Sequence, residues 1–541
     1  MKDYILQLFE TASQELEYLA AKEIQLSVPA NLDHGELSTN IAMILTKELK
    51  KNPRQIAQEI IDSLNDSKNY LDKIEIAGPG FINFYFNHNF LSTIVKDISV
   101  KKNEFGKSKK YHGKKAMVEF VSANPTGPLT VGHGRNAVIG DTIANLLEAI
   151  GYEVDREYYF NNAGRQMRVL GDSLRLRCLE LLGDIIDFPE DYYQGEYIID
   201  IAKRVINEHG AKCRNFEIDF FKKRAEDEIF AEIKMTLERL GIIMANFYNE
   251  NDLYENGKIE EVKKIFSEKN LTYEKDGALW LKLSKLGRED DKVMVKSTGE
   301  PTYRLPDIAY HTTKFERGYD FIVDLFGSDH NATYPDVIAG VKALGYDESK
   351  IKVVIHQFVT ITKGGEAVKM STRKANFVTL DELMDDVGAD VVRYFFLMRG
   401  VNTHLNFDLD IAKKQSDENP VFYLQYAHAR ICSILRMTEE QGLNTDLSKL
   451  HKLTKPEEIN LIKQLHHFSD EIIFAAENCE PNKLANYLEN LAASFHKFYT
   501  ECRIIGSEKE IAQARIALIE AVRMVMKNGL TIIGISAPEK M

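Results

Sequence analysis

The hydrophobic and polar positions of the chain alternate between short apolar runs and stripes with helical spacing. Residues 116–122 are mostly apolar and predict a short buried strand. Apolar residues then recur three or four positions apart through residues 139–150, which predicts one buried face of a helix. Gly151 follows where a helix-terminating glycine belongs, and residues 152–160 predict the next strand. A strand, a helix and a strand in this order indicate a right-handed parallel crossover.

The same pattern returns between residues 321 and 355, again as strand, helix and strand. The stretch from about 175 to 290 is rich in charged helical segments and then becomes hairpin-like. We interpret it as an insertion between two halves of one doubly wound parallel sheet. The predicted fold class is therefore α/β and Rossmann-like.

The two ends of the chain show other patterns. In the first part, Asn52 and Pro53 form a typical helix start, and residues 73–86 predict a hairpin. From about residue 405 to the end the pattern is helical throughout, which predicts an all-α bundle. Three domains follow: an N-terminal α/β domain, a catalytic domain with the insertion, and a C-terminal helical domain, at residues 1–105, 106–400 and 401–541.

The composition narrows the class of protein. With 44% hydrophobic and 28% charged residues, the 541-residue chain has the balance of a soluble globular protein, and no window resembles a membrane-spanning helix. No C-x-x-C pair occurs, so neither a zinc ribbon nor a disulfide framework is predicted, and we expect a reducing, cytoplasmic location. A net charge of −13 argues against a general nucleic-acid binder but allows a shape-specific RNA partner that meets local basic strips.

The turn after the strand at 116–122 carries the first candidate chemistry. In parallel sheets, ligands bind beyond the carboxyl ends of strands, where a helix N-terminus offers unpaired N–H groups. Gly127, Gly132 and Gly134 let a backbone come close to a ligand there, and no P-loop lysine follows. His133 can donate a hydrogen bond to phosphate oxygens as charge grows in a transition state. The alternative is a helix-cap histidine without a catalytic task.

A second candidate is a lysine that follows a Gly-Gly pair. A flexible loop that carries Lys369 can close over a triphosphate and stabilise the leaving pyrophosphate. Lys363 and Arg373 are further candidates for this contact. On local composition alone, an ordinary charged surface loop explains the segment better. Its order in the chain relative to His133 favours the nucleotide-binding interpretation.

Both segments match motifs of a known family. The turn resembles the HIGH motif of class I aminoacyl-tRNA synthetases in the sequence PTGPLTVGHGR, and the loop resembles their KMSKS motif in the sequence KMSTR. Thr130 replaces the first histidine of the family motif and Thr372 the second lysine, so leaving-group stabilisation would rest on Lys369. Within this class the chain resembles arginyl-tRNA synthetases over nearly its whole length, in the phrases GELSTNIAM, VEFVSANPTGPLTVGHGRNAVIGD, YYFNNAGRQM, PTYRLPDIAYH, YLQYAHARICSILR and KNGLTIIGISAPEKM.

The resemblance implies an arginine–tRNA ligase reaction in two steps. ATP and L-arginine would form an adenylate, with Mg2+ on the phosphates, and the arginyl group would then pass to the 3' end of tRNA-Arg. Positioning and electrostatics would dominate the first step, which the family resemblance implies to require bound tRNA. The helical domain is implied to bind the anticodon and the N-terminal domain the tRNA elbow. We expect a monomer without a membrane partner.

The resemblance and the local chemistry together imply roles for individual residues. The expected catalytic residues are His133, Lys369 and Thr130. The expected ATP-binding residues are Pro125, Gly127, Gly132, His133, Gly134, Gln357, Phe358, Lys369, Met370, Ser371 and Arg373, with Gln357 and Phe358 meeting adenine through main-chain groups. A guanidinium needs carboxylates placed for bidentate pairing. The expected arginine-binding residues are Glu119, Ser122, Asn124, Tyr303, Asp307, Asp329 and His330. The expected anticodon-binding residues are Tyr423, Tyr426, His428, Arg430 and Met541.

Three alternatives remain open at this point. Another class I synthetase is the first, although a cysteine-specific one would need a cluster of zinc ligands, which the sequence lacks. A non-catalytic tRNA-binding paralogue is the second, and loss of His133 and Lys369 would favour it, yet both are present. The third is a small-molecule nucleotidyltransferase with the same strand, turn and helix, which would not need a C-terminal helical bundle.

Overall fold

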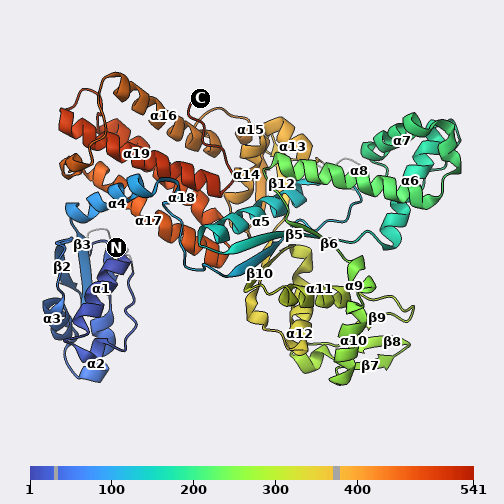
Figure 1. Ribbon diagram of the computed structural model, residues 1–541, viewed down its shortest axis with the longest axis horizontal. Coiled ribbons are helices and arrows are strands. Elements are labelled where there is room, and N and C mark those ends of the chain that lie inside the picture. The colour runs from blue at the N-terminus through green and yellow to red at the C-terminus, as the bar shows by residue number, and fades with distance from the viewer. Residues whose placement is uncertain (28, 30–33, 369–377) are drawn as a thin grey trace. The chain divides into compact units, whose positions relative to one another are not determined.

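The computed structural model describes every residue of the chain except 28, 30–33 and 369–377 (Figure 1). The chain divides into two compact units. Unit 1 contains residues 1–105, 431–467 and 493–525, and unit 2 contains residues 106–430, 468–492 and 526–541. Within the described part of the chain, no helix is both long enough and apolar enough to cross a membrane.

Unit 2 is built on a five-stranded parallel sheet. Its strand order is β11-β10-β4-β5-β6, and every neighbouring pair is parallel. The two central strands are buried over most of their length, as expected of strands covered by helices on both faces. The strands are β4 (Lys115–Glu119), β5 (Glu153–Phe160), β6 (Asn246–Asn249), β10 (Phe321–Gly327) and β11 (Ile351–His356).

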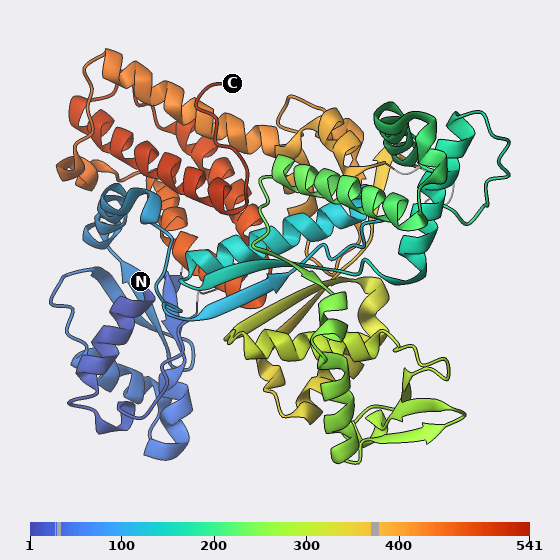
Figure 2. The ribbon, with the colours of Figure 1, turned by 45° about the vertical axis from the view of Figure 1, so that its right-hand side comes forward.

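Two crossovers leave the centre of this sheet in opposite directions. β4 continues through α5 (Val131–Ala149) to β5, and β10 continues through α12 (Tyr334–Leu344) to β11. α5 lies on one face of the sheet, whereas α11 (Arg304–Glu316) and α12 lie on the other (Figures 1 and 2). The carboxyl ends of β4 and β10 therefore open side by side, at the place where doubly wound sheets bind ligands. The predicted α/β fold is confirmed.

The predicted helix after β4 is confirmed and lies very close to the sheet. Its apolar stripe is buried within α5, and Gly151 follows the helix with a φ of 105°. Gly140 is buried in the same helix, and a Cβ atom there would collide with the Phe120 ring just beyond β4. The missing side chain thus lets α5 and β4 approach each other directly.

The segment predicted as an insertion is not wholly outside the sheet. β6 lies within it and pairs in parallel with the end of β5, so this segment supplies an edge strand. The strand has only four residues, too few to show a period in the sequence. The other elements, which include a small antiparallel sheet of order β7-β8-β9, are α6 (Gly164–Leu181), α7 (Glu196–His209), α8 (Ile218–Arg239), α9 (Asn251–Glu255), α10 (Lys258–Glu268), β7 (Thr272–Lys275), β8 (Ala278–Leu281) and β9 (Lys292–Val295).

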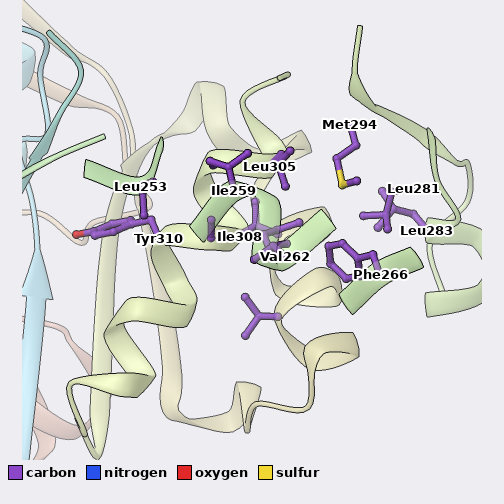
Figure 3. Packing of buried hydrophobic residues seen from close by; sticks show 13 residues of the cluster. Leu253, Ile259, Val262, Phe266, Leu281, Leu283, Met294, Leu305, Ile308 and Tyr310 are labelled. Carbon is purple, nitrogen blue, oxygen red and sulfur yellow. The ribbon is translucent and has the colours of Figure 1, made fainter. Parts of the chain in front are cut away.

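The small sheet shares a hydrophobic core with α10, α11 and α12 (Figure 3). Val262 and Phe266 of α10 meet Leu305 and Ile308 of α11 in this cluster. Tyr310 lies at its border, with its hydroxyl directed away from the aliphatic side chains (Figure 3). The core anchors one side of α11 and leaves other positions of that helix to face the parallel sheet.

The C-terminal part is helical as predicted, apart from one strand. β14 (Leu405–Asp408) pairs in parallel with β12 (Val359–Lys363), which also pairs with β13 (Glu366–Ala367). The prediction of helix from residue 405 is wrong for this strand, whose first residues alternate between buried and exposed. The helices are α13 (Leu380–Val387), α14 (Ala389–Leu397), α15 (Leu409–Ala412), α16 (Pro420–Glu440), α17 (Pro456–Asn478), α18 (Asn482–Glu501) and α19 (Lys509–Ile532).

Unit 1 begins with a small antiparallel sheet of order β1-β3-β2. The predicted hairpin is confirmed as β2 and β3. The helix start at Asn52 is confirmed as well, because its side chain accepts the Arg54 N–H at 2.9 Å. The division of the chain into three domains stays a prediction. The elements are α1 (Lys2–Ala12), β1 (Leu37–Thr39), α2 (Ile41–Leu49), α3 (Pro53–Ser63), β2 (Leu71–Ala77), β3 (Phe81–Phe86) and α4 (His88–Lys101).

We expect Gly140→Ala to destabilise unit 2, because the new methyl group would collide with the base of the Phe120 ring. Overpacking of this kind costs about 1–3 kcal/mol of the free energy of unfolding. Gly132→Ala is the matched control on the same helix, since its Cβ would find no atom closer than Thr130 Oγ1 at 3.7 Å. Denaturant titrations followed by circular dichroism compare the two variants, and equal midpoints would contradict the close approach of α5 to β4.

Candidate active site

The carboxyl ends of the parallel strands bring several predicted site residues to one edge of unit 2. Glu119 ends β4, and His133 lies on the first turn of α5. Asp307 lies on the first turn of α11, within electrostatic reach of Glu119. The buried ring of His356 ends β11 and is likewise within reach of His133 and Asp329. The two halves of the sheet thus contribute to one site.

Three carboxylates form a row across the sheet, at adjacent positions of neighbouring strands. Asp324 of β10 is the register partner of Glu119 of β4, which is in turn the partner of Glu157 of β5. All three are buried, with exposed fractions of 0%, 4% and 0%. Because register partners on neighbouring strands lie on the same face, such charges repel one another unless cations lie among them. We call these three residues the acid row.

α11 supplies the cations that the acid row requires. Lys314 Nζ lies 2.5 Å from Glu119 Oε2 and 2.6 Å from Asp324 Oδ1. Arg317, one turn further along, pairs with Glu157 through both terminal nitrogens. Burial alone would raise the pKa of Glu157, but the Arg317 guanidinium outweighs it and the pKa is lowered. Each carboxylate of the acid row is therefore in an ion pair with a cation from the same end of α11.

Asp307 lies on the same face of α11, two turns before Lys314, and forms no ion pair with any residue that the structure describes. Burial is the main reason why the pKa of Asp307 is raised to about 7. The charges of Glu119 and Glu250 act in the same direction, whereas His311 and Lys314 oppose them. Asp307 is therefore the acid of this site that gains most from a cationic ligand.

Glu250 is a site residue that the sequence analysis missed. It directly follows β6 and accepts hydrogen bonds from Tyr159 Oη and Asn161 Nδ2, both at 2.8 Å. Burial raises the pKa of its carboxyl. The N–H of Asn161 also donates to Asn124 Oδ1 at 2.9 Å, which connects this acid to the loop after β4. Glu250 could be identified from the sequence only if β6 were predicted, because this strand places Glu250 at the carboxyl edge of the sheet.

The chain leaves β4 through two residues in the left-handed region. Val121 has a φ of 68° and Ser122 a φ of 44°, which is rare for a β-branched residue and costs about 1–3 kcal/mol each. Asn136 of α5, also missed in the sequence, holds the turn: it accepts the Val121 N–H at 2.6 Å and donates to the Leu325 carbonyl of β10 at 3.1 Å. The strained turn directs the Ser122 hydroxyl to Glu119, to which it donates at 2.9 Å.

His133 is both a helix cap and a candidate donor. Thr130 is the N-cap residue of α5, and its Oγ1 accepts the His133 N–H at 3.5 Å. In return the Thr130 N–H donates to His133 Nδ1 at 3.2 Å, so the ring proton of the neutral histidine is carried by Nε2. Burial lowers the pKa of His133, which keeps the ring neutral. Thr130 therefore caps α5, and the catalytic role expected of it stays a prediction.

The three glycines of the turn differ in what they face. Gly132 is exposed and faces open space, which suits the expected close approach of a ligand. Gly134 is buried, and a Cβ there would press on Leu380 of α13, so its missing side chain serves helix packing; the ligand approach expected at Gly134 stays a prediction. A Cβ on Gly127 would lie 3.1 Å from Tyr197 Oη, so this glycine is covered by α7.

The strand end after β11 is held by a buried arginine that the sequence analysis did not single out. Arg135 donates to the Gln357 carbonyl at 2.6 Å and to the Thr403 carbonyl at 3.0 Å, and burial lowers its pKa to about 10. The Gln357 N–H donates to the Val401 carbonyl at 3.1 Å. Both main-chain groups of Gln357 thus form internal hydrogen bonds, and the adenine contact expected of Gln357 and Phe358 stays a prediction. Phe358 lies beside it with 63% of its surface exposed.

The other expected arginine-binding residues lie at the rim of the site. Tyr303 is 87% exposed at the start of α11. The side chains of Asp329 and His330 are 70% and 50% exposed after β10. Asn124 is exposed in the loop after β4, and Pro125 beside it is buried. These residues border the carboxyl edge, and among the described residues none of them has a hydrogen bond or ion pair with the acid row.

Most of the predicted lysine loop cannot be described. Lys369, Met370, Ser371 and Arg373 lie outside the described residues. Lys363 ends β12 and is exposed.

The described part of the chain holds no cluster of His, Cys, Asp or Glu residues that could bind a metal ion by itself.

Two of the residues expected at the anticodon form one exposed group on α16. Tyr426 is 38% exposed, and its ring is stacked on Phe422 with an angle of 7° between the planes. Arg430 Nη1 donates to Tyr426 Oη at 3.1 Å, as the spacing of four residues predicts. Tyr423 is half-buried on the same helix, and burial raises its pKa. The Tyr426 ring is therefore partly exposed on α16, with the half-buried Arg430 beside it.

His428 does not belong to this exposed group. It is only 1% exposed, and its Nδ1 lies 2.9 Å from the Pro538 carbonyl. Its position two residues after Tyr426 turns it to the covered side of α16, where it holds the C-terminal segment. The role of His428 in binding the anticodon stays a prediction. Met541, at the end of that segment, is 57% exposed.

The doubly wound sheet, with a histidine on the first turn of the helix that follows a central strand, belongs to the catalytic domain of a class I aminoacyl-tRNA synthetase. Family models agree with this assignment. The model of tRNA synthetases class I (R), catalytic domain, matches residues 94–393. The model of the arginyl tRNA synthetase N terminal domain matches residues 3–86, and the model of the DALR anticodon binding domain matches residues 424–541.

Curated relatives and a solved structure specify the family. The chain is 50% identical to the arginine–tRNA ligase of Desulfotalea psychrophila, over 96% of this chain and 95% of the relative. It is also 50% identical to that of Pelodictyon phaeoclathratiforme over 100% of both chains. A Campylobacter jejuni crystal structure described as an arginyl-tRNA synthetase has a TM-score of 0.78 and 33% identity, covering 84% of this chain and 100% of that one. The chain belongs to the arginyl-tRNA synthetase family.

We expect Asp307→Asn to stabilise the ligand-free protein at neutral and higher pH. The folded-state pKa of about 7 exceeds the unfolded value of about 3.9, so the acid makes the folded state lose stability as the pH rises from about 4 to about 7. Removal of the acid should raise the free energy of unfolding by about 1–3 kcal/mol near pH 8, and this gain should shrink towards pH 4.

Thermal denaturation of both proteins across this pH range measures the effect. Asp329→Asn is the control, because its side chain is 70% exposed and its removal should leave the stability unchanged. A loss of stability near pH 8 in Asp307→Asn, or a gain that does not vary with pH, would contradict the unpaired state of Asp307.

Proposed function

We propose that the protein charges tRNA-Arg with L-arginine, by forming arginyl adenylate from ATP and then transferring the arginyl group to the 3' end of the tRNA. Pyrophosphate leaves in the first step and AMP in the second. One observation of the structure carries the proposal beyond family membership. The acid row and the unpaired Asp307 lie at the same carboxyl edge as the N-terminus of α5. Buried acids suit a cationic substrate, and a helix N-terminus suits phosphate groups.

The guanidinium of arginine binds Asp307 in this proposal. Asp307 forms no ion pair with a described residue, and a planar fork of donors can pair with it through two hydrogen bonds. Glu119 and Glu250 border the same space with their negative charges. Asn124 and Tyr303, which are exposed at the rim, can turn to the α-amino and carboxylate groups. Lysine lacks the planar fork and would lose the paired geometry.

Adenylate formation depends on alignment and on the stabilisation of negative charge. The arginine carboxylate attacks the α-phosphorus of ATP in line, and the pyrophosphate leaves. His133 donates through Nε2–H to a phosphate oxygen, because its Nδ1 is held by the Thr130 N–H. The open space at Gly132 allows ATP to reach the first N–H groups of α5. Lys369 steadies the pyrophosphate, and Mg2+ bound to ATP would supply further positive charge at the phosphate groups.

The tRNA meets the C-terminal helices at its anticodon and the N-terminal domain at its elbow. Tyr426 offers a ring and Arg430 a planar cation for stacking of an unpaired base. Tyr423 and Met541 lie on or near the same helical part and complete the proposed contact. A monomeric state and a cytoplasmic location are part of the proposal as well.

Charging assays with purified protein, total tRNA and each standard amino acid test the proposed specificity. Only arginine should become attached to tRNA. L-citrulline, which keeps the shape of arginine but lacks its charge, is the sharpest negative control, since an unpaired Asp307 gives it no advantage. Charging of citrulline at a rate near that of arginine, or charging of another amino acid in place of arginine, would overturn the assignment.

We expect His133→Ala to lower kcat for tRNA-dependent pyrophosphate exchange on the order of 10²–10³-fold, because the variant loses a donor to the transition state. Thr130→Ala is the control for the cap: it should cost about 0.5–2 kcal/mol of the free energy of unfolding but change kcat far less. Exchange rates and thermal midpoints of both variants check the difference. Equal losses of kcat in the two variants would make His133 a structural cap only.

A further inference from the structure

The acid row places two like charges where a sheet ordinarily cannot hold them. Glu119 and Asp324 are register partners on β4 and β10, so their side chains start from neighbouring strands on the same face. Neither is exposed to water, which would otherwise screen the repulsion. Two ionised carboxylates at these positions need a cation directly between them.

Lys314 is that cation, and its environment is entirely internal. Its side chain is 0% exposed, and its Nζ contacts both carboxylates, at 2.5 Å and 2.6 Å. The same Nζ lies 4.3 Å from the centre of the Tyr310 ring. Burial alone would lower the pKa of Lys314, but the charges of Asp324 and Glu119 outweigh it and the pKa is raised. The lysine is therefore charged in its buried position.

The two oxygens of Glu119 are held by different partners. Oε2 accepts from Lys314, and Oε1 accepts from Ser122 at 2.9 Å. A carboxylate has about four acceptor positions, so each oxygen keeps one for a further donor. The carboxylate is thus fixed in orientation before any ligand arrives, and it lies within electrostatic reach of Asp307.

We propose that Lys314 is a positioning residue for arginine binding, which acts by fixing the Glu119 carboxylate in the orientation that accepts the substrate. This inference rests on the proposed function, in which Glu119 borders the bound arginine. Without the ammonium group, Glu119 and Asp324 repel each other and Glu119 turns away from β10. The substrate then has to pull the carboxylate back into place, so its apparent affinity falls while the later chemical step is little changed.

Arg317 provides a matched control on the same helix. It also pairs with a buried carboxylate of the acid row, Glu157 on β5. Glu157 is fully engaged by Arg317, Tyr310 and Asn246, and it is not among the main charges that shift the pKa of Asp307. Loss of Arg317 therefore removes a buried ion pair of the same kind without touching Glu119.

The experiment compares Lys314→Met, Lys314→Arg and Arg317→Met in aminoacylation assays with tRNA-Arg, together with their thermal midpoints. Lys314→Met should raise KM for arginine by about tenfold or more, with kcat and KM for ATP changed by less than about threefold. Lys314→Arg keeps the cation and should recover most of the affinity. Arg317→Met should lower the thermal midpoint to a similar degree but leave KM for arginine within about twofold. If Lys314→Met is not recovered as folded protein, Lys314→Gln, which keeps a donor without the charge, takes its place.

Two outcomes would overturn the inference. One is an unchanged KM for arginine in Lys314→Met or Lys314→Gln, and the other is an equal rise of this KM in Arg317→Met. Failure of the proposed function gives different results. In that case the unaltered protein would not attach arginine to tRNA, or the Glu119→Gln variant would have the same KM for arginine as the unaltered protein.

Discussion

The acid row and the two cations that neutralise it are the interaction on which the rest of the site depends. Parallel pairing of β10, β4 and β5 brings Asp324, Glu119 and Glu157 side by side, and the sheet can hold them only because Lys314 and Arg317 enter from α11. Removal of one partner of such a buried pair typically costs 3–5 kcal/mol, about the same order as the stability of a whole domain. α11 is in turn anchored by the apolar core that it shares with α10 and α12. The same helix carries Asp307, so the placement of the cations also places the acid that remains unpaired.

A second set of hydrogen bonds, near the ends of β4 and β10, fixes the part of the site that is proposed to bind ATP. Asn136 joins the strained turn at Val121 to the end of β10, and the cap between Thr130 and His133 fixes one ring nitrogen as an acceptor. Both restraints belong to the first turns of α5, which lies on the opposite face of the sheet from α11. The sheet edge therefore separates two electrostatic environments: helix N–H groups on one side and excess carboxylates on the other. That separation suits a substrate with a cationic side chain and a co-substrate with a triphosphate.

Local patterns in the sequence were sufficient for the main elements, whereas contacts between distant residues were not. The strand and helix at 115–149 were found because their periods are regular, but β6 and β14 have only four residues each and left no period. Glu119 and Asp307 came from a resemblance, since a strand glutamate is otherwise most often a solvated residue. Lys314, Glu157 and Asp324 could not be found at all, because strand register, which the sequence does not reveal, creates the row. The burial of His428 could not be predicted for a related reason: helical spacing gives the angle between side chains, but it does not reveal that the C-terminal segment covers this side of α16.

The central claim is that the substrate guanidinium supplies the charge that Asp307 lacks, and calorimetry measures this most directly. Arginine is titrated into the protein with bound tRNA at pH 7 in two buffers that differ in ionisation enthalpy. Since the pKa of Asp307 is about 7 before binding and a guanidinium partner lowers it, about half a proton should be released for each arginine bound. This release should disappear in Asp307→Asn. Binding without any exchange of protons with the buffer at this pH, or the same release in Asp307→Asn, would contradict the account.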